Sequence, residues 1–116
     1  MITIKNHNGE IAIQEAVFGN VVGHVVNNCF GVVGMAAASA KDGIVSLLKN
    51  ENYARGVKVT GDGEALCLEL HIIVSYGVNL PEISRSITKE TKYIVEKMTG
   101  FHVKSVRVCI DAMKLD

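Results

Sequence analysis

The sequence has few of the residues that mark linkers between domains. Pro81 is the single proline among the 116 residues, and the 11 glycines are dispersed along the chain. No polar stretch of low complexity interrupts a sequence that is 48% hydrophobic, which argues against disordered segments. Because a chain of this length has room for one hydrophobic core, we predict a single domain over residues 1–116.

Charge of one sign is not in excess. The 12 lysines and arginines balance the 12 aspartates and glutamates, so the formal net charge is zero. Nucleic-acid binding draws its affinity from lysine and arginine side chains that neutralise phosphates, and a balanced chain offers no overall attraction to them. Nucleic acid is therefore not an expected partner.

Long apolar runs and paired cysteines are missing too. Polar residues such as Asn20, His24 and Asn27 keep every apolar stretch far shorter than the roughly 20 residues of a membrane span. The first residues lack the basic start, apolar run and cleavage site of a secretion signal. The cysteines are an odd number without short-range pairing: Cys29, Cys67 and Cys109. These absences predict a reduced, cytoplasmic chain.

The clearest periodic signal lies between residues 66 and 74. Five apolar side chains occupy alternate positions there, which is the two-residue period of a strand with one buried face. A period near 3.6 predicts helices elsewhere, the best from Leu80 to Met98, with Asn79 as its cap and Gly100 as its stop. The expected elements are a strand or hairpin at 2–13, a helix at 14–29, a central strand at 31–37, a helix at 42–50, strands from 56 and 66, a helix at 80–98 and a strand from 103.

The order of these elements is β-α-β-α-β-β-α-β. Asp42 can cap the helix at 42–50, which carries the apolar residues Ile44, Val45, Leu47 and Leu48. The alternation along the strands predicts a sheet with one buried face. We therefore predict an α/β (α+β) fold, a two-layer sandwich of a mixed sheet with helices mainly on one face and the other face partly open.

Histidines and cysteines form no recognisable metal motif. Zinc ligands usually come in close pairs such as C-x-x-C, whereas these cysteines lie roughly 40 residues apart. Cys67, His71 and Cys109 can share a sheet face if their strands are neighbours, but a reduced cysteine is usually a small apolar residue. No strained nucleophile turn supports a Cys–His pair, and Glu64 and Glu69 are expected to be solvated. We predict no catalytic residue, cofactor, metal or small-molecule substrate, and hence no enzyme.

Glycines do not form a nucleotide-binding motif either. Neither G-x-G-x-x-G nor G-x-x-x-x-G-K-[ST] occurs. Gly31 and Gly34 match the G-x-x-G of KH domains, but the two valines between them offer no cation to a phosphate, and this segment is predicted to be a strand. Gly19 and Gly23 lie one helical turn apart, where close packing against the sheet is favoured over a partner site.

Two surfaces are candidates for contact with a partner. Arg85, Lys89 and Lys92 form a basic stripe on the helix at 80–98, away from its apolar stripe. On the open sheet face the outward residues are mixed, and Ile73 and Cys109 make it less polar than a solvated face. Such a face, with strand edges that need protection, indicates self-association or docking of another protein. The predicted contact residues are Arg85, Lys89, Lys92, Ile73, His71 and Arg107.

Four segments carry a resemblance to a known family. CFGVVGMA (29–36), NYARGV (52–57), YGVNLP (76–81) and TGFHV (99–103) resemble the alkaline shock protein family, or Gls-type envelope stress family, and its short single-domain members in particular. The resemblance implies a cytosolic, non-enzymatic Gram-positive protein linked to envelope stress or homeostasis. It also implies relatives that self-associate and are held at the membrane by a separate anchor, and it supplies no catalytic motif. We therefore expect a cytoplasmic chain that is peripheral at the membrane only through a membrane-anchored partner.

Three functional hypotheses follow. The favoured one is a scaffold or adaptor that acts by protein–protein contact and self-association. The second is a regulatory accessory subunit of an enzyme of lipids or envelope precursors, bound through the basic stripe. The third is a KH-like nucleic-acid binder.

Overall fold

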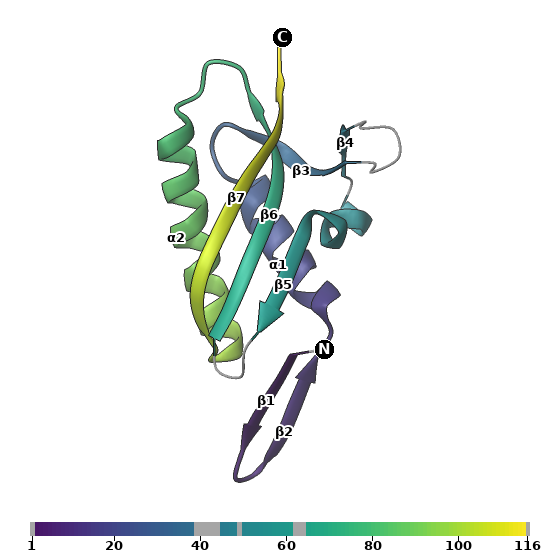
Figure 1. The fold of residues 1–116 in the computed structure, drawn as a ribbon, viewed down its shortest axis with the longest axis vertical. Coiled ribbons are helices and arrows are strands. Elements are labelled where there is room, and N and C mark those ends of the chain that lie inside the picture. The colour runs from purple at the N-terminus through teal and green to yellow at the C-terminus, as the bar shows by residue number, and fades with distance from the viewer. Residues whose placement is uncertain (1, 39–44, 49, 62–64, 116) are drawn as a thin grey trace.

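The chain begins with a hairpin that stands apart from the rest of the fold. The computed structural model describes residues 2–38, 45–48, 50–61 and 65–115. Within them, β1 (Ile2–Asn6) and β2 (Gly9–Ile13) pair antiparallel and project from one end of the molecule (Figure 1). This two-stranded sheet agrees with the strand or hairpin expected at 2–13.

The main sheet is built around one long strand. β6 (Ala65–Ser75) is paired along its whole length with β7 (His102–Lys114), which runs parallel to it. The opposite edge of β6 is shared by two antiparallel strands, β5 (Val57–Gly61) along its first half and β3 (Val32–Ala38) at its end. β4 (Val45–Leu47) pairs with β3 and lies outermost on that side. The sheet is therefore mixed, as predicted.

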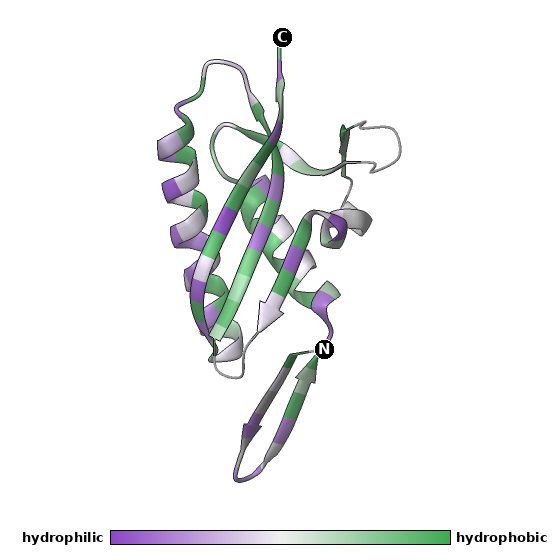
Figure 2. Cartoon of the chain, in the orientation of Figure 1, coloured by the Kyte–Doolittle hydropathy of each residue, from purple (hydrophilic) through white to green (hydrophobic). Residues whose placement is uncertain are grey.

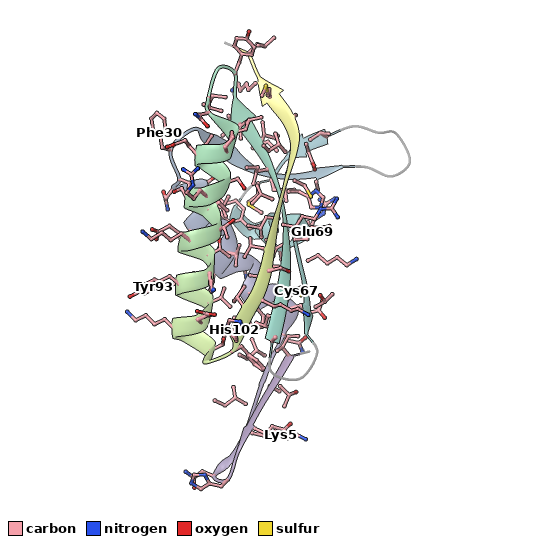
Figure 3. All side chains as sticks on the ribbon, turned by 60° about the vertical axis from the view of Figure 1, so that its left-hand side comes forward. Lys5, Phe30, Cys67, Glu69, Tyr93 and His102 are labelled. Atoms are coloured by element: carbon pink, nitrogen blue, oxygen red, sulfur yellow. The ribbon has the colours of Figure 1, made fainter. Side chains whose placement is uncertain are left out.

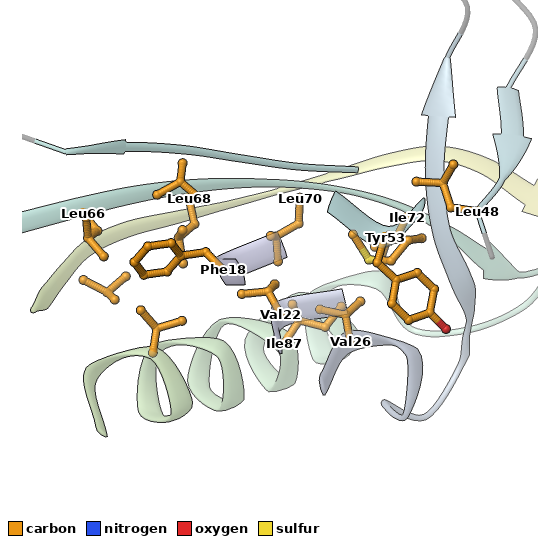
Figure 4. Packing of buried hydrophobic residues seen from close by; sticks show 14 of the residues in the cluster. Phe18, Val22, Val26, Leu48, Tyr53, Leu66, Leu68, Leu70, Ile72 and Ile87 are labelled. Carbon is orange, nitrogen blue, oxygen red and sulfur yellow. The ribbon is translucent and has the colours of Figure 1, made fainter. Parts of the chain in front are cut away.

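Both α-helices of the described residues cover the same face of this sheet. α1 (Glu15–Asn27) and α2 (Leu80–Thr99) contact each other, and their buried side chains meet the alternate residues of β6 (Figure 4). Those five residues are at most 2% exposed: Leu66, Leu68, Leu70, Ile72 and Val74. Burying one such side chain stabilises the fold by about 1.5–3 kcal/mol. The two-layer sandwich is thus confirmed, and Figure 2 shows hydrophobic and hydrophilic segments alternating along α2 and β7.

The ends of α2 agree with the sequence signals. The Asn79 side chain accepts a hydrogen bond from the Glu82 backbone N–H at 3.1 Å, so it caps the helix. Gly100 has a φ of 78°, in the left-handed region, and its N–H donates to the Glu96 carbonyl at 2.9 Å. Asn79 therefore fixes where the chain enters the helical layer, and Gly100 fixes where it leaves that layer for the sheet.

The helix predicted at 42–50 is wrong in its described part. Val45–Leu47 is strand β4, and a 3₁₀ segment follows at Asn50–Gly56, while Asp42 and Ile44 lie outside the described residues. An apolar run this short does not distinguish the 3.6-residue period of a helix from the two-residue period of a strand. Pairing with β3 therefore decides its conformation. The strand expected at 31–37 is confirmed as β3, although β6 holds the central position.

The two glycines of α1 allow close contact with the 3₁₀ segment rather than with the sheet. A Cβ atom on Gly19 would lie 2.6 Å from Ala54 Cα, and one on Gly23 would lie 2.5 Å from Tyr53 Cβ. Tyr53 is 7% exposed and belongs to the core. Gly19 and Gly23 are therefore packing residues, as expected, but their neighbour is the 3₁₀ segment.

We expect Gly23→Ala to destabilise the protein. The new methyl group would collide with the Cβ of Tyr53, which cannot rotate away, and overpacking of this kind costs about 1–3 kcal/mol. This outweighs the gain of roughly 1 kcal/mol that alanine brings to a helix. Thermal unfolding followed by circular dichroism measures the effect, and Asn20→Ala, at an exposed position of α1, is the control that should not lose stability. An unchanged melting temperature for Gly23→Ala would contradict the packing argument.

Glu96 connects the last turn of α2 to the first residues of β7. Its Oε2 accepts a hydrogen bond from the Val103 backbone N–H at 2.8 Å and lies 3.1 Å from His102 Nδ1. The hydrogen bond from Val103, with smaller contributions from the charges of Lys92 and His102, lowers the pKa of Glu96 below its ordinary value. The ionised carboxylate therefore stabilises the junction between helix and strand.

This link predicts a dependence of stability on pH. Because the folded pKa of Glu96 is below the unfolded one, its contribution is present above the ordinary glutamate pKa and is lost as the pH falls through the folded value. Glu96→Gln keeps an acceptor for Val103 but no charge. The melting temperatures of wild type and Glu96→Gln should therefore differ at neutral pH and converge in acid. A constant difference across this range would refute the assignment.

Candidate functional site

The face of the sheet opposite the helices carries a cluster of polar side chains. Because the even-numbered apolar residues of β6 point into the core, Cys67, Glu69 and His71 point to the open face. The parallel register sets Glu69 beside Arg107 and His71 beside Cys109 of β7. Residues 38 positions apart in sequence are thus brought to neighbouring positions of one surface.

A bulge in β7 adds a second carboxylate. Ile72 pairs with Ile110, but Ile73 pairs with Ala112, so Asp111 is an extra residue without a partner in β6. Bulges of this kind redirect a side chain, and they are rare between parallel strands. Here the carboxylate of Asp111 reaches the imidazole of His71.

The four side chains Glu69, His71, Cys109 and Asp111 are called the open-face cluster from here on. Nδ1 of His71 lies 3.1 and 3.0 Å from the two carboxylate oxygens of Asp111, and its Nε2 lies 3.0 Å from Oε2 of Glu69. Ligand atoms of Glu69, His71 and the Cys109 thiol all lie within 4.8 Å of one another. The side chains of His71, Glu69 and Asp111 are 33%, 31% and 16% exposed, so the cluster is partly accessible to solvent.

Ionisation in the cluster favours a charged imidazole between two carboxylates. Partial burial acts to lower the pKa of His71, but the hydrogen bonds to Asp111 and Glu69 outweigh it and raise the pKa above its ordinary value. The hydrogen bond from His71, helped by the charges of Arg107 and Lys58, lowers the pKa of Glu69. A neutral imidazole has one N–H, so only the protonated ring can donate to both carboxylates at once.

Two shallow hollows flank the cluster. One, of about 560 Å³, is lined by His71, Asp111, Arg55 and apolar side chains of β3, β4 and β7. The other, of about 240 Å³, lies beside Glu69 and Arg107, with Lys58 and Thr60 from β5. Both open to solvent on the same face, so the open-face cluster is accessible and does not lie in a deep cleft.

The sequence alone does not predict this cluster. It predicts a solvated Glu69 and gives Asp111 no role, whereas both carboxylates contact the His71 imidazole. The alternation along 66–74 did place Cys67 and His71 on one side, and a shared face with Cys109 was considered. The parallel pairing of β6 with β7 and the bulge at Asp111, which complete the cluster, leave no signal in a single sequence.

The six predicted contact residues divide between two opposite faces. Arg85, Lys89 and Lys92 are exposed on the outer side of α2, and His71 and Arg107 lie on the open sheet face. Figure 3 shows Tyr93 of α2 and Glu69 of β6 on opposite sides of the molecule. Ile73 is only 9% exposed, which corrects the expectation that it makes the open face apolar.

The outer side of α2 has a hollow of its own. It measures about 470 Å³ and is lined by Lys89, Glu90, Lys92, Tyr93 and Glu96. Tyr93 is 61% exposed, and the ammonium group of Lys97 lies 5.6 Å from the centre of its ring. Arg85 is 3.3 Å from Glu82, so one cation of the stripe is partly neutralised.

The G-x-x-G segment is not a loop in this structure. Gly34 lies within β3 and is buried, and a Cβ there would come within 2.8 Å of Leu47 Cδ1. Gly31 has a φ of 82°, which a tight turn before the strand requires. Both glycines are thus explained by packing and turn geometry, as the strand prediction implied.

Comparison with known proteins identifies the family. Over residues 3–115 the sequence matches the alkaline shock protein 23 family, which is described by a cell envelope-related function. This chain belongs to that family. The alkaline shock resemblance of its four sequence segments is thereby confirmed, together with the envelope-related function that the resemblance implied.

Relatives in this family match nearly end to end. The chain is 34% identical over 115 residues to YloU of Bacillus subtilis (strain 168), which covers 98% of this chain and 96% of YloU. It is 36% identical to Spy1614 of Streptococcus pyogenes serotype M6, covering 98% and 95%, and 23% identical to YqhY of Bacillus subtilis, covering 95% and 81%. No solved structure matches the chain significantly. Within the described residues, neither helix has the length and apolar character needed to cross a bilayer.

Proposed function

We propose that this family member is a non-enzymatic scaffold or adaptor for the cell envelope, which acts by protein–protein contact and self-association. The observation that carries the proposal is the outer edge of β7. This strand has 13 residues, and among the described strands only β6 pairs with it. Its other edge presents backbone N–H and C=O groups that a further strand can bind.

Two irregularities limit where such a strand can bind. The register of β7 against β6 shifts at Lys104 and again at Asp111, so residues 105–110 form a regular segment between two bulges. Bulges bend and twist an edge and thereby disfavour unlimited pairing. The regular segment is long enough for a short, defined ladder, which favours a discrete assembly over aggregation.

Exposed apolar side chains gather where β7 ends. The Tyr76 N–H donates to the Lys114 carbonyl, and the Ser75 N–H donates to the Gly31 carbonyl, both at 3.0 Å, so the α1–β3 turn, the β6–α2 turn and the end of β7 lie together. This end carries four large exposed side chains, whose exposed fractions are 92%, 70%, 44% and 71%: Phe30, Tyr76, Met113 and Leu115. A group of this kind supports contact with another protein.

Disulfide trapping tests self-association through β7. Cys29, Cys67 and Cys109 are replaced by serine, and single cysteines are introduced in the regular segment as Ser105→Cys or Arg107→Cys. Antiparallel pairing of two β7 strands brings equivalent Cα atoms near the two-fold axis to about 4.5–5.5 Å, within disulfide range. We expect mild oxidation to give a covalent dimer from at least one of them.

The matched control places the cysteine on the opposite face, as Lys89→Cys on α2, and should give no covalent dimer on oxidation. Light scattering of the wild-type chain over a concentration series provides the second measurement. A monomer at every concentration, or equal crosslinking from Lys89→Cys, would count against self-association through the β7 edge.

The outer face of α2 supports a second candidate, a regulatory accessory of an envelope-precursor or lipid enzyme. The favouring observation is a hollow lined by the exposed Tyr93 together with Lys89, Lys92, Glu90 and Glu96. With Lys97 over the ring of Tyr93, cations outnumber carboxylates around this exposed aromatic side chain. An acidic partner surface fits this arrangement, because cationic side chains and an amphipathic ring combine charge with apolar contact.

Charge reversal tests the α2 surface. The triple variant Arg85→Glu, Lys89→Glu and Lys92→Glu should lose its partners in a pull-down after in-cell crosslinking. The control reverses three lysines outside α2, as Lys5→Glu, Lys104→Glu and Lys114→Glu, and should keep the partners that bind through α2. An identical set of captured proteins for wild type and the α2 variant would exclude this candidate.

A further inference from the structure

We propose that the open-face cluster is a zinc-binding site in which Glu69, His71 and Cys109 are the ligands and Asp111 positions the histidine. The inference does not depend on the scaffold function, because all four residues belong to one chain and two neighbouring strands. The proposed ligand is a borderline-soft divalent cation, bound on the open face of the sheet.

The donor atoms match zinc in kind and in spacing. Zinc prefers imidazole nitrogen, thiolate sulfur and carboxylate oxygen, and this cluster supplies one of each. In a tetrahedral site with bonds of about 2.0–2.3 Å, ligand atoms lie roughly 3.3–3.8 Å apart. The three donors lie within 4.8 Å of one another, so small side-chain rotations suffice to bring them onto one ion.

Asp111 supplies what a zinc-bound histidine usually has. A ligating imidazole commonly donates its other ring N–H to a carboxylate, which fixes the ring orientation and raises its basicity. Nδ1 of His71 faces both oxygens of Asp111 at 3.0–3.1 Å, while Nε2 faces Glu69 at 3.0 Å. The ring is thus oriented with Nε2 toward the ligand Glu69, and the β7 bulge places Asp111 at the other nitrogen.

The supporting structure and the charge balance also fit. The ligands stand on the two longest strands of the sheet, so their backbone is held by pairing along both β6 and β7. Binding releases the proton of the Cys109 thiol and the Nε2 proton of His71, so the ring ligates in its neutral form and two anionic ligands neutralise a divalent ion. Arg107, 3.4 Å from Glu69, orients that carboxylate from the side away from His71.

Three protein ligands leave one coordination position. Because the side chains of Glu69 and His71 are about one-third exposed, that position faces solvent. Structural zinc sites usually close the coordination shell with four protein ligands, whereas a site with three keeps a position for water or an incoming group. The cluster is therefore of the open type. Ions such as Mg²⁺ and Ca²⁺, which require oxygen ligands, do not fit a site with a thiolate.

Cobalt(II) is the probe that reads this ligand set, since it takes zinc's place and absorbs visible light when a thiolate and a tetrahedral shell surround it. The full chain is reduced, stripped with a chelator and titrated with Co²⁺, and then with Zn²⁺ to displace it. We expect one ion per chain and a thiolate-to-cobalt absorption band. The band should disappear in Cys109→Ser and remain in Cys67→Ser, whose thiol lies on the same face of β6 but outside the cluster.

Alkylation of the wild-type chain gives a readout that needs no variant to fold. Zn²⁺ should protect Cys109 from a thiol reagent and leave Cys67 as reactive as before, which peptide mass spectrometry resolves. Asp111→Asn should weaken zinc binding by about 10–100-fold without changing the stoichiometry, because Asp111 acts through His71. The proposal is overturned if no ion binds, if the band survives in Cys109→Ser, or if zinc leaves the alkylation of Cys109 unchanged.

Discussion

The burial of one side of β6 is the constraint on which the rest of the structure depends. Its five alternate apolar side chains are almost completely inaccessible, and they meet α1 and α2 in a single core. A strand has a side-chain period of two, so fixing one face of β6 against the helices also fixes which residues leave the core. Cys67, Glu69 and His71 reach the open face for this reason. A slip of one residue would bury Glu69 and His71 and expose the leucines.

The same constraint explains which parts of the fold the sequence predicts. The long alternation at 66–74 and the capped amphipathic helix at 80–98 are strong periodic signals, and both are confirmed nearly to the residue as β6 and α2. The segment around Val45 was too short for periodicity to decide, and pairing with β3 makes it a strand. In this chain the sequence pattern therefore predicts each long helix or strand and the face that it buries.

The candidate site depends on the pairing of distant strands, which local periodicity does not predict. Cys109 and His71 become neighbours only because β7 runs parallel to β6 in one register, and Asp111 reaches His71 only because of a bulge. Parallel pairing joins segments separated by a whole helix, and the register is decided by long-range contacts rather than by local propensity. A single sequence therefore shows that polar residues occupy one face, but not which of them touch.

β7 carries part of the open-face cluster and also provides the free sheet edge, so binding at one is expected to affect binding at the other. Its side chains Cys109 and Asp111 belong to the open-face cluster and Arg107 contacts Glu69 beside it, while its outer backbone edge is available to a further strand. Backbone pairing at the edge would stiffen the strand that carries Cys109. Conversely, an ion held between β6 and β7 would fix the twist of the segment at 105–110. Occupancy of the cluster and pairing of the edge should therefore be linked equilibria, each favouring the other.

The two-layer architecture also separates the basic α2 surface from the open sheet face. The buried core lies between them, so a partner on α2 does not compete for space with a second protein on the sheet or at its edge. A scaffold requires this property, since it must hold more than one neighbour at a time. The distribution of chemistry over two opposite faces is therefore the structural feature that supports the adaptor role proposed above.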